Sequence, residues 1–105
     1  MSDLNVNADF FPLDGQLFCE KLALLIKQKR LDRQLRQEDL AQAIGSSLST
    51  IKRIERGDKS VEYGVVIKAL WYLGILDQLN QSLPEIEQKT KQRRIRLAKI
   101  DEDNF

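Results

Sequence analysis

The chain has no histidine and a single cysteine, Cys19. Without histidine, neither a zinc finger with histidine ligands nor a histidine-based catalytic site can be built, and we expect no bound metal. One cysteine excludes an intrachain disulfide, so Cys19 is predicted to be a small buried apolar residue.

Long apolar runs are also missing, since the longest covers only residues 22–26. That run is far too short to cross a membrane, and residues 1–5 lack the basic start of a signal peptide. We therefore expect a cytoplasmic protein that makes no membrane contact. At 105 residues, with 42% hydrophobic and 31% charged residues, it should form one small domain with tails.

Acidic residues occur in pairs, Glu38 with Asp39 and Glu85 with Glu87, but each pair sits among polar surface residues. No glycine-rich loop or convergent base lies nearby in the sequence. The pairs thus do not resemble a catalytic site. We expect neither enzymatic activity nor a cofactor.

Residues 37–57 have the spacing of a helix-turn-helix motif: two short helices joined by a tight turn. Apolar residues fall on one face of each predicted helix, namely Leu40, Ala41 and Ile44, then Ile51 and Ile54. Gly45 stands where the chain must turn, and Ser46 and Ser47 can cap the second helix.

The motif resembles the Cro/phage-repressor (XRE) family of DNA-binding domains, and the resemblance extends from about Leu22 to about Leu79. Shared features are the Gln-Glu-x-Leu-Ala opening at residues 37–41, the Glu-Arg-Gly ending at 55–57, and Leu-Gly at 73–74. The resemblance implies a compact all-α domain of five helices and an ion pair between Arg30 and Glu55. A helical bundle that binds only protein is the less favoured alternative.

The family often places glycine where the chain leaves its first helix, but this chain has Gln34 there. A left-handed glutamine is possible at some energetic cost. Otherwise, the exit from the first helix has a different shape.

The resemblance also implies which side chains meet double-stranded DNA. The base-reading set is Leu48, Ser49, Lys52 and Arg53. The phosphate-binding set is Arg36, Gln37, Ser47, Thr50, Arg56, Lys59 and Ser60. Arg53 is the candidate for a bidentate contact with guanine, and Leu48 for contact with a thymine methyl group. Thr50 could instead cap the turn, and Arg56 could be a solvated surface residue.

Local signals divide the chain into an arm (1–14), a DNA-binding domain (15–82) and a basic tail (83–105). The first helix should run from about 16 to 33 with Asp14 as its cap. Its apolar residues form one stripe for the core (Phe18, Leu22, Leu25, Ile26) and a second for the arm or another chain (Leu17, Leu24, Leu31). Later helices should cover about 61–73, with Ser60 as cap, and about 75–81.

Apolar residues also gather on the side predicted to lie far from DNA. They are Trp71, Ile75, Leu76 and Leu79. In the resembling family this region often holds a dimer together, so these residues are a candidate homodimer interface. An equally good interpretation is that they only complete the core.

The formal net charge is only +1, but the charges are unevenly distributed. Six basic residues and no acidic residue lie between 88 and 100, whereas the N-terminal region is acidic. The tail is either a solvated end or an arm that binds DNA phosphates. We slightly favour the arm, because the tail lacks the apolar spacing that would anchor a helix on another protein.

Three regulatory settings fit such a repressor. The order of arm, domain, residues 73–79 and Arg-rich tail resembles HipB-type antitoxins, which repress their own operon and bind a HipA-like kinase toxin. The alternatives are a stand-alone phage-type repressor and a controller protein of a restriction-modification operon. A protein-interaction module without DNA binding is disfavoured by the polar and basic residues between 46 and 56.

Overall fold

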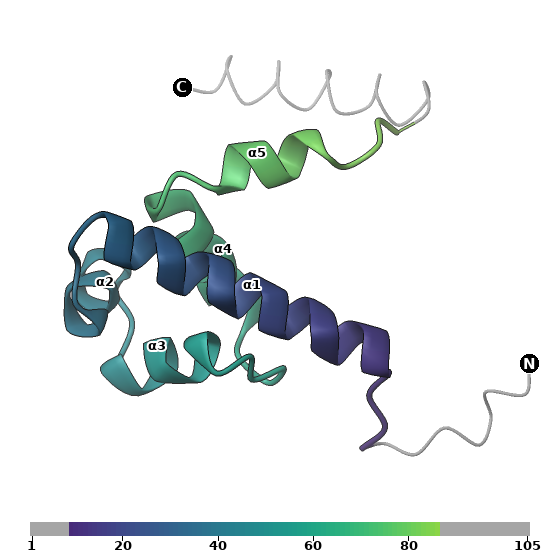
Figure 1. The fold of residues 1–105 in the computed structure, drawn as a ribbon, viewed down its shortest axis with the longest axis horizontal. Coiled ribbons are helices and arrows are strands. Elements are labelled where there is room, and N and C mark those ends of the chain that lie inside the picture. Colours follow the sequence, from purple (N-terminus) through teal and green to yellow (C-terminus); the bar gives the residue numbers. More distant parts are fainter. Residues whose placement is uncertain (1–8, 87–105) are drawn as a thin grey trace, which may run out of the picture.

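A computed structural model describes residues 9–86, which form five α-helices and no strand (Figure 1). The helices are α1 (Leu13–Asp32), α2 (Gln37–Ile44), α3 (Leu48–Glu55), α4 (Tyr63–Tyr72) and α5 (Leu76–Gln81). The predicted all-α fold of five helices is confirmed. Within residues 9–86, no helix has both the length and the apolar content needed to cross a bilayer.

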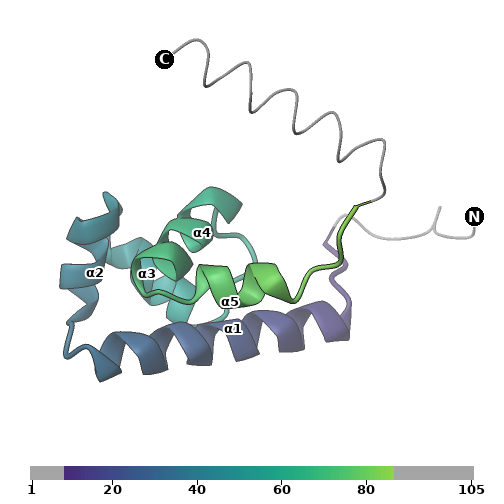
Figure 2. The same ribbon diagram turned by 90° about the horizontal axis from the view of Figure 1, so that it is seen from above.

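The longest helix, α1, lies along one side of the domain, and the other four helices lie on the same side of it (Figure 2). It begins at Leu13, inside the stretch predicted to be a non-helical arm, because Pro12 is extended and its carbonyl accepts from the Gln16 amide at 3.1 Å. Asp14 lies in the first turn and does not cap it, so that prediction was wrong.

The chain leaves α1 through Gln34, whose φ of 58° is the only positive value outside glycine in residues 9–86. The Leu35 amide then reaches back to the Arg30 carbonyl at 3.1 Å. The structure therefore has the left-handed glutamine at the end of α1, and not the differently shaped turn that was the alternative. Gln34 thus makes this turn without a glycine.

The turn between α2 and α3 has the predicted form. Gly45 adopts a left-handed φ of 69°, and the Ser46 amide donates to the Ala41 carbonyl at 2.8 Å. The Ser47 hydroxyl accepts from the Thr50 amide at 3.1 Å and so caps α3. Ala41 is buried where α2 meets its neighbours, as expected for a small residue at a close crossing.

Two predicted boundaries after α3 need correction. Ser60 does not cap α4, since its hydroxyl bonds to Asp58 and α4 begins only at Tyr63, after Glu62. The next turn closes at Gly74, with a φ of 76°, and α5 begins one residue later than expected, at Leu76.

The core lies between α1, α2, α3, α4 and the start of α5. Its buried residues are Ile26, Leu40, Ala41, Ile44, Ile51, Ile54, Ala69, Leu70, Leu73 and Ile75. Leu22 and Leu25 pack against this cluster, but Phe18 is 65% exposed and does not join them as predicted. Cys19 is only half-buried and does not belong to the core cluster, so the prediction that it is buried was wrong.

Ile75 is only 2% exposed, so it belongs to the core of one subunit and cannot form a dimer interface as predicted. Leu76 and Leu79 also pack partly against the core. Of the proposed interface, only Trp71 presents most of its side chain to solvent.

Candidate nucleic-acid interface

A buried ion pair fixes α3 against α1. The Arg30 guanidinium donates to both carboxylate oxygens of Glu55, with Nε–Oε2 at 2.7 Å and Nη2–Oε1 at 3.0 Å. The side chains are only 8% and 4% exposed. Arg30 also donates to the Leu35 carbonyl at 2.8 Å, so the exit of α1 is tied to the same cation. The predicted Arg30–Glu55 pair is confirmed.

Gln37 belongs to the same cluster. Its Nε2 donates to Glu55 Oε1 at 3.0 Å, which leaves one amide hydrogen for a DNA phosphate. The first residue of α2 and the last residue of α3 are therefore connected directly. Gln37 positions the motif whether or not it contacts DNA.

The outward face of α3 carries three of the four predicted base-reading residues in exposed positions: Leu48, Ser49 and Lys52. The only acidic residue of α3 is Glu55, and its charge is paired with Arg30. The exposed face of α3 is therefore free of negative charge from its own helix, which favours contact with a polyanion.

Thr50 is half-buried at the start of α3, and its hydroxyl lies 2.9 Å from the Ser47 hydroxyl. The alternative in which Thr50 supports the turn is thus the one that the contacts favour. Ser47 uses the same hydroxyl to cap α3. Phosphate contacts by Ser47 and Thr50 remain predictions.

Arg53, the proposed guanine reader, is hydrogen-bonded to the loop after α3. Its Nε donates to Asp58 Oδ2 at 3.0 Å and its Nη2 to the Ser60 hydroxyl at 2.6 Å. Asp58 in turn accepts from the Ser60 amide at 2.8 Å and from its hydroxyl at 2.6 Å. The guanidinium is fixed in orientation, and its Nη1 has no hydrogen bond to residues 9–86.

The same contacts shift the titration of Asp58. Its hydrogen bond from the Ser60 hydroxyl, then the Ser60 amide and the Arg53 guanidinium, lower the pKa of this carboxyl far below its usual range. Asp58 is therefore charged at neutral pH. The sequence interpretation missed it, although an Asp two residues before Ser60 in a loop is the signature of an Asx-turn.

Two carboxylates surround Arg36 at the start of α2. Its guanidinium lies 2.7 Å from Glu38 and 3.0 Å from Asp39, and its amide donates to Asp39 at 2.7 Å. The hydrogen bond between these two side chains lowers the pKa of the Asp39 carboxyl and raises the pKa of the Arg36 guanidinium. A phosphate contact by Arg36 would therefore have to compete with these two acids.

The loop after α3 meets the N-terminal arm. Lys59 Nζ lies 5.6 Å from the centre of the Phe11 ring, a cation–π distance. Phe11 is 39% exposed and Phe10 is 59% exposed, so the domain buries neither ring. Arg56, Lys59 and Ser60 all lie at exposed positions around this loop.

Tyr63 is a second residue that sequence reasoning overlooked. It is the first residue of α4, three positions after Ser60, and is 82% exposed. Its hydroxyl can donate to a phosphate oxygen. No local sequence signal marks Tyr63 for such a contact.

A shallow hollow separates the start of α2 from α3 and is lined by Arg36, Gln37, Glu38, Leu48 and Lys52. It brings predicted phosphate-binding and base-reading residues to one surface. No group of three or more potential metal ligands occurs in the part of the chain that the structure describes.

Comparison with known proteins agrees with this geometry. Residues 26–75 match the family model described as helix-turn-helix. Searches of curated proteins and of solved structures gave no significant match. The matched range starts within α1 and ends at the residue before α5, so it includes the Arg30–Glu55 pair and the whole of α3. Residues 26–75 are therefore similar to the helix-turn-helix family, in agreement with the two helices and the tight turn that the structure has at residues 37–55.

Proposed function

We propose that the protein is a sequence-specific repressor that binds an inverted-repeat operator as a dimer. The observation that carries this proposal is the outward face of α3, where Leu48, Ser49 and Lys52 are exposed and the helix's one acid is neutralised by Arg30. Such a face offers an apolar contact, a hydroxyl and a cation to base edges in the major groove.

The residue roles follow from this face. Leu48, Ser49, Lys52 and Arg53 read base edges, while Arg56, Lys59 and Ser60 anchor the adjacent phosphates, with Tyr63 as an added anchor. Arg36, Gln37, Ser47 and Thr50 complete the phosphate set at the start of α2 and α3. Arg53 reads a base through its unbonded Nη1 edge or after exchange of its contact with Asp58.

Dimerisation is part of the proposal because one recognition helix reads only a few base pairs. Specific sites for such proteins commonly contain two half-sites about 34 Å apart. Trp71, with the half-buried Leu76 and Leu79, provides one candidate surface for the second copy.

The direct test is selection of DNA from a random duplex pool by the full-length protein, followed by titration of the enriched sequence. We expect an inverted repeat whose affinity exceeds that of random duplex by at least about a thousandfold. Lys52→Ala should reduce this ratio, whereas the matched control Lys68→Ala, an exposed lysine on α4, should leave it unchanged. Recovery of no common sequence would contradict a specific repressor.

For biological setting, we propose the autorepressing antitoxin of a HipBA-like pair, acting in the bacterial cytoplasm with a HipA-like kinase toxin as partner. Support comes from the sequence layout, and the Arg-rich part of the tail lies outside residues 9–86. The alternatives are a phage-type repressor and a restriction-modification controller. A kinase-like reading frame beside the gene would support the antitoxin, whereas a methyltransferase would support the controller.

A further inference from the structure

A row of leucines occupies the face of α1 that points away from the core. Leu13, Leu17, Leu24 and Leu31 are 72%, 47%, 67% and 52% exposed. Residues seven positions apart in a helix differ by only about 20° in direction, so Leu17, Leu24 and Leu31 share one line about 21 Å long. Single exposed leucines are common, but three that recur every seven residues along one line of a helix indicate a partner surface.

No other helix covers this row in the described part of the chain. Figure 2 shows α2, α3, α4 and α5 all on one side of α1. Buried Ala23, Ile26 and Arg30 define the inner face of the helix. The outer row is thus separate from the core and from α3, and its removal should not unfold the domain.

We propose that this row binds a second copy of the same chain, with the two α1 helices antiparallel and crossing at Leu24. This inference deepens the dimeric function proposed above and rests on it. In this arrangement Leu24 meets Leu24 of the partner subunit, and Leu17 meets Leu31 of the partner subunit. The row is self-complementary because Leu17 and Leu31 are equally distant from Leu24.

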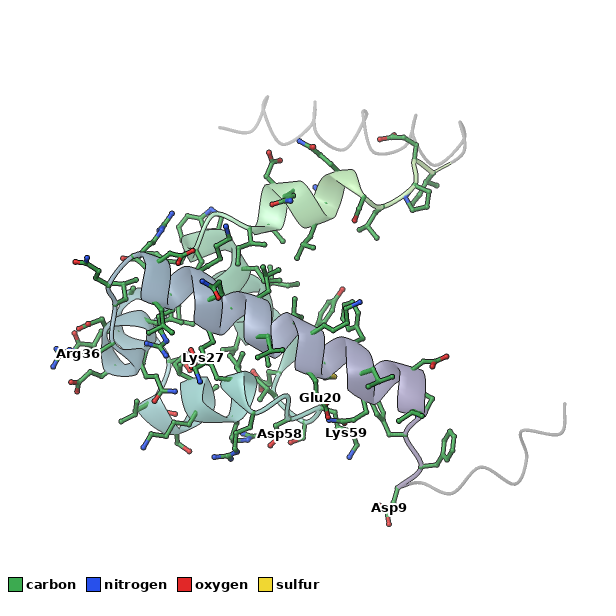
Figure 3. The ribbon with its side chains drawn as sticks, viewed as in Figure 1. Asp9, Glu20, Lys27, Arg36, Asp58 and Lys59 are labelled. Carbon is green, nitrogen blue, oxygen red and sulfur yellow. The ribbon has the colours of Figure 1, made fainter. Side chains whose placement is uncertain are left out.

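Charges beside the row fit the same symmetry. Glu20 precedes Leu24 by four residues and Lys27 follows it by three, and both lie on the flank of α1 that faces α3 (Figure 3). A twofold axis at Leu24 therefore brings Glu20 opposite Lys27 of the partner subunit, twice per dimer. Neither side chain has a salt-bridge partner in residues 9–86. A parallel pair would not place these opposite charges together.

The symmetry also suits DNA. Glu20 lies against the loop after α3. Gly57 of that loop is so close that a Cβ atom added to it would lie 3.3 Å from the Glu20 Cα. Rotation about an axis perpendicular to both α1 helices keeps the α3 flank of each copy on the same side of the dimer. Both recognition helices thus face one side, as an inverted repeat requires.

The first experiment measures the dimer dissociation constant of the full-length chain by sedimentation equilibrium. We expect Leu24→Glu to raise this constant at least tenfold while thermal unfolding stays close to wild type. Phe18→Glu is the matched control, 65% exposed on the same helix but outside the row, and should leave the constant unchanged. Trp71→Glu tests the alternative surface on α4. Weakening by Trp71→Glu with no effect of Leu24→Glu would overturn the α1 interface but leave the dimeric function intact.

A second pair of variants tests the antiparallel register even if Leu24→Glu fails to fold. Glu20→Lys and Lys27→Glu should each form weaker homodimers than wild type, because each creates two repulsive contacts. Mixed in equal amounts, they should form a heterodimer several-fold tighter than either homodimer. No preference for the mixture would refute this register. A wild-type protein that stays monomeric and binds half-sites singly would instead refute the dimeric function itself.

Discussion

Arg30 and Glu55 form a two-point ion pair between the last turn of α1 and the last residue of α3, with almost no exposure of either side chain. No buried side-chain nitrogen or oxygen in residues 9–86 lacks a hydrogen-bond partner, so this charge is fully satisfied. Removing one partner would strand the other in the core, which costs about 3–5 kcal/mol in comparable cases.

The first prediction follows from this burial. Arg30→Met and Glu55→Gln should each destabilise the domain more than the double variant does, because losing one partner leaves the other's charge buried without a counter-charge. Chemical denaturation of all four proteins gives the coupling free energy, which we expect well above the roughly 0–1 kcal/mol of surface pairs. Arg36→Met with Glu38→Gln, an exposed pair, is the control. Additive effects at residues 30 and 55 would show that the pair acts only as a surface contact.

The second prediction separates base reading from phosphate anchoring. Arg53→Ala should cost about 1–3 kcal/mol on the operator and relax preference at one base pair, whereas Lys59→Ala should weaken binding to all duplexes alike. Titrations against the operator and single-base variants, at several salt concentrations, measure both. Equal losses on operator and random DNA for Arg53→Ala would remove this residue from the reading set.

The third prediction concerns Asp58, a negative charge beside the proposed DNA surface. Asp58→Asn should release Arg53 and raise affinity for random duplex several-fold while lowering the ratio between operator and random DNA. Asp77→Asn, an exposed acid on α5, should change neither quantity. Unchanged random-duplex binding by Asp58→Asn would show that the Arg53–Asp58 contact does not restrain DNA binding.

The fourth prediction tests Asp58 again, by the dependence of stability on pH. The folded pKa of Asp58 is lowered below the unfolded value of about 3.9, so its stabilising contribution is present above that pH and is lost as pH falls further. The stability difference between wild type and Asp58→Asn should therefore shrink below about pH 4. Denaturant unfolding at pH 7 and pH 3 measures it. A constant difference would mean that Asp58 is not preferentially ionised in the folded protein.

The last prediction concerns the six basic residues between 88 and 100 of the tail, which lie outside the described residues. If it contacts phosphates, deletion after Gln88 should lower the slope of log affinity against log salt by several units per dimer, because each contact adds about 0.9. If it binds a toxin, the slope should stay the same and the truncated protein should fail to retain the kinase in a pull-down. An unchanged slope would refute the DNA arm.

Local sequence patterns determined the two helices and the turn of the motif at residues 37–57. The small Ala41, the left-handed Gly45 and the Ser47 cap are decided within a few residues of chain, so the motif at residues 37–57 was predictable. The Arg30–Glu55 pair was predicted only through family resemblance, since no local rule connects residues 25 positions apart.

Tertiary packing decided what periodicity could not. Whether Ile75 or Trp71 faces the core depends on how the turn at Gly74 returns the chain, and the structure buries Ile75 and exposes Trp71. Arg53 looked free in the sequence, but the loop after α3 brings Asp58 and Ser60 against it. Apolar and charged stripes in the sequence indicate which contacts a helix can make. The packing of neighbouring elements determines which of these contacts are made.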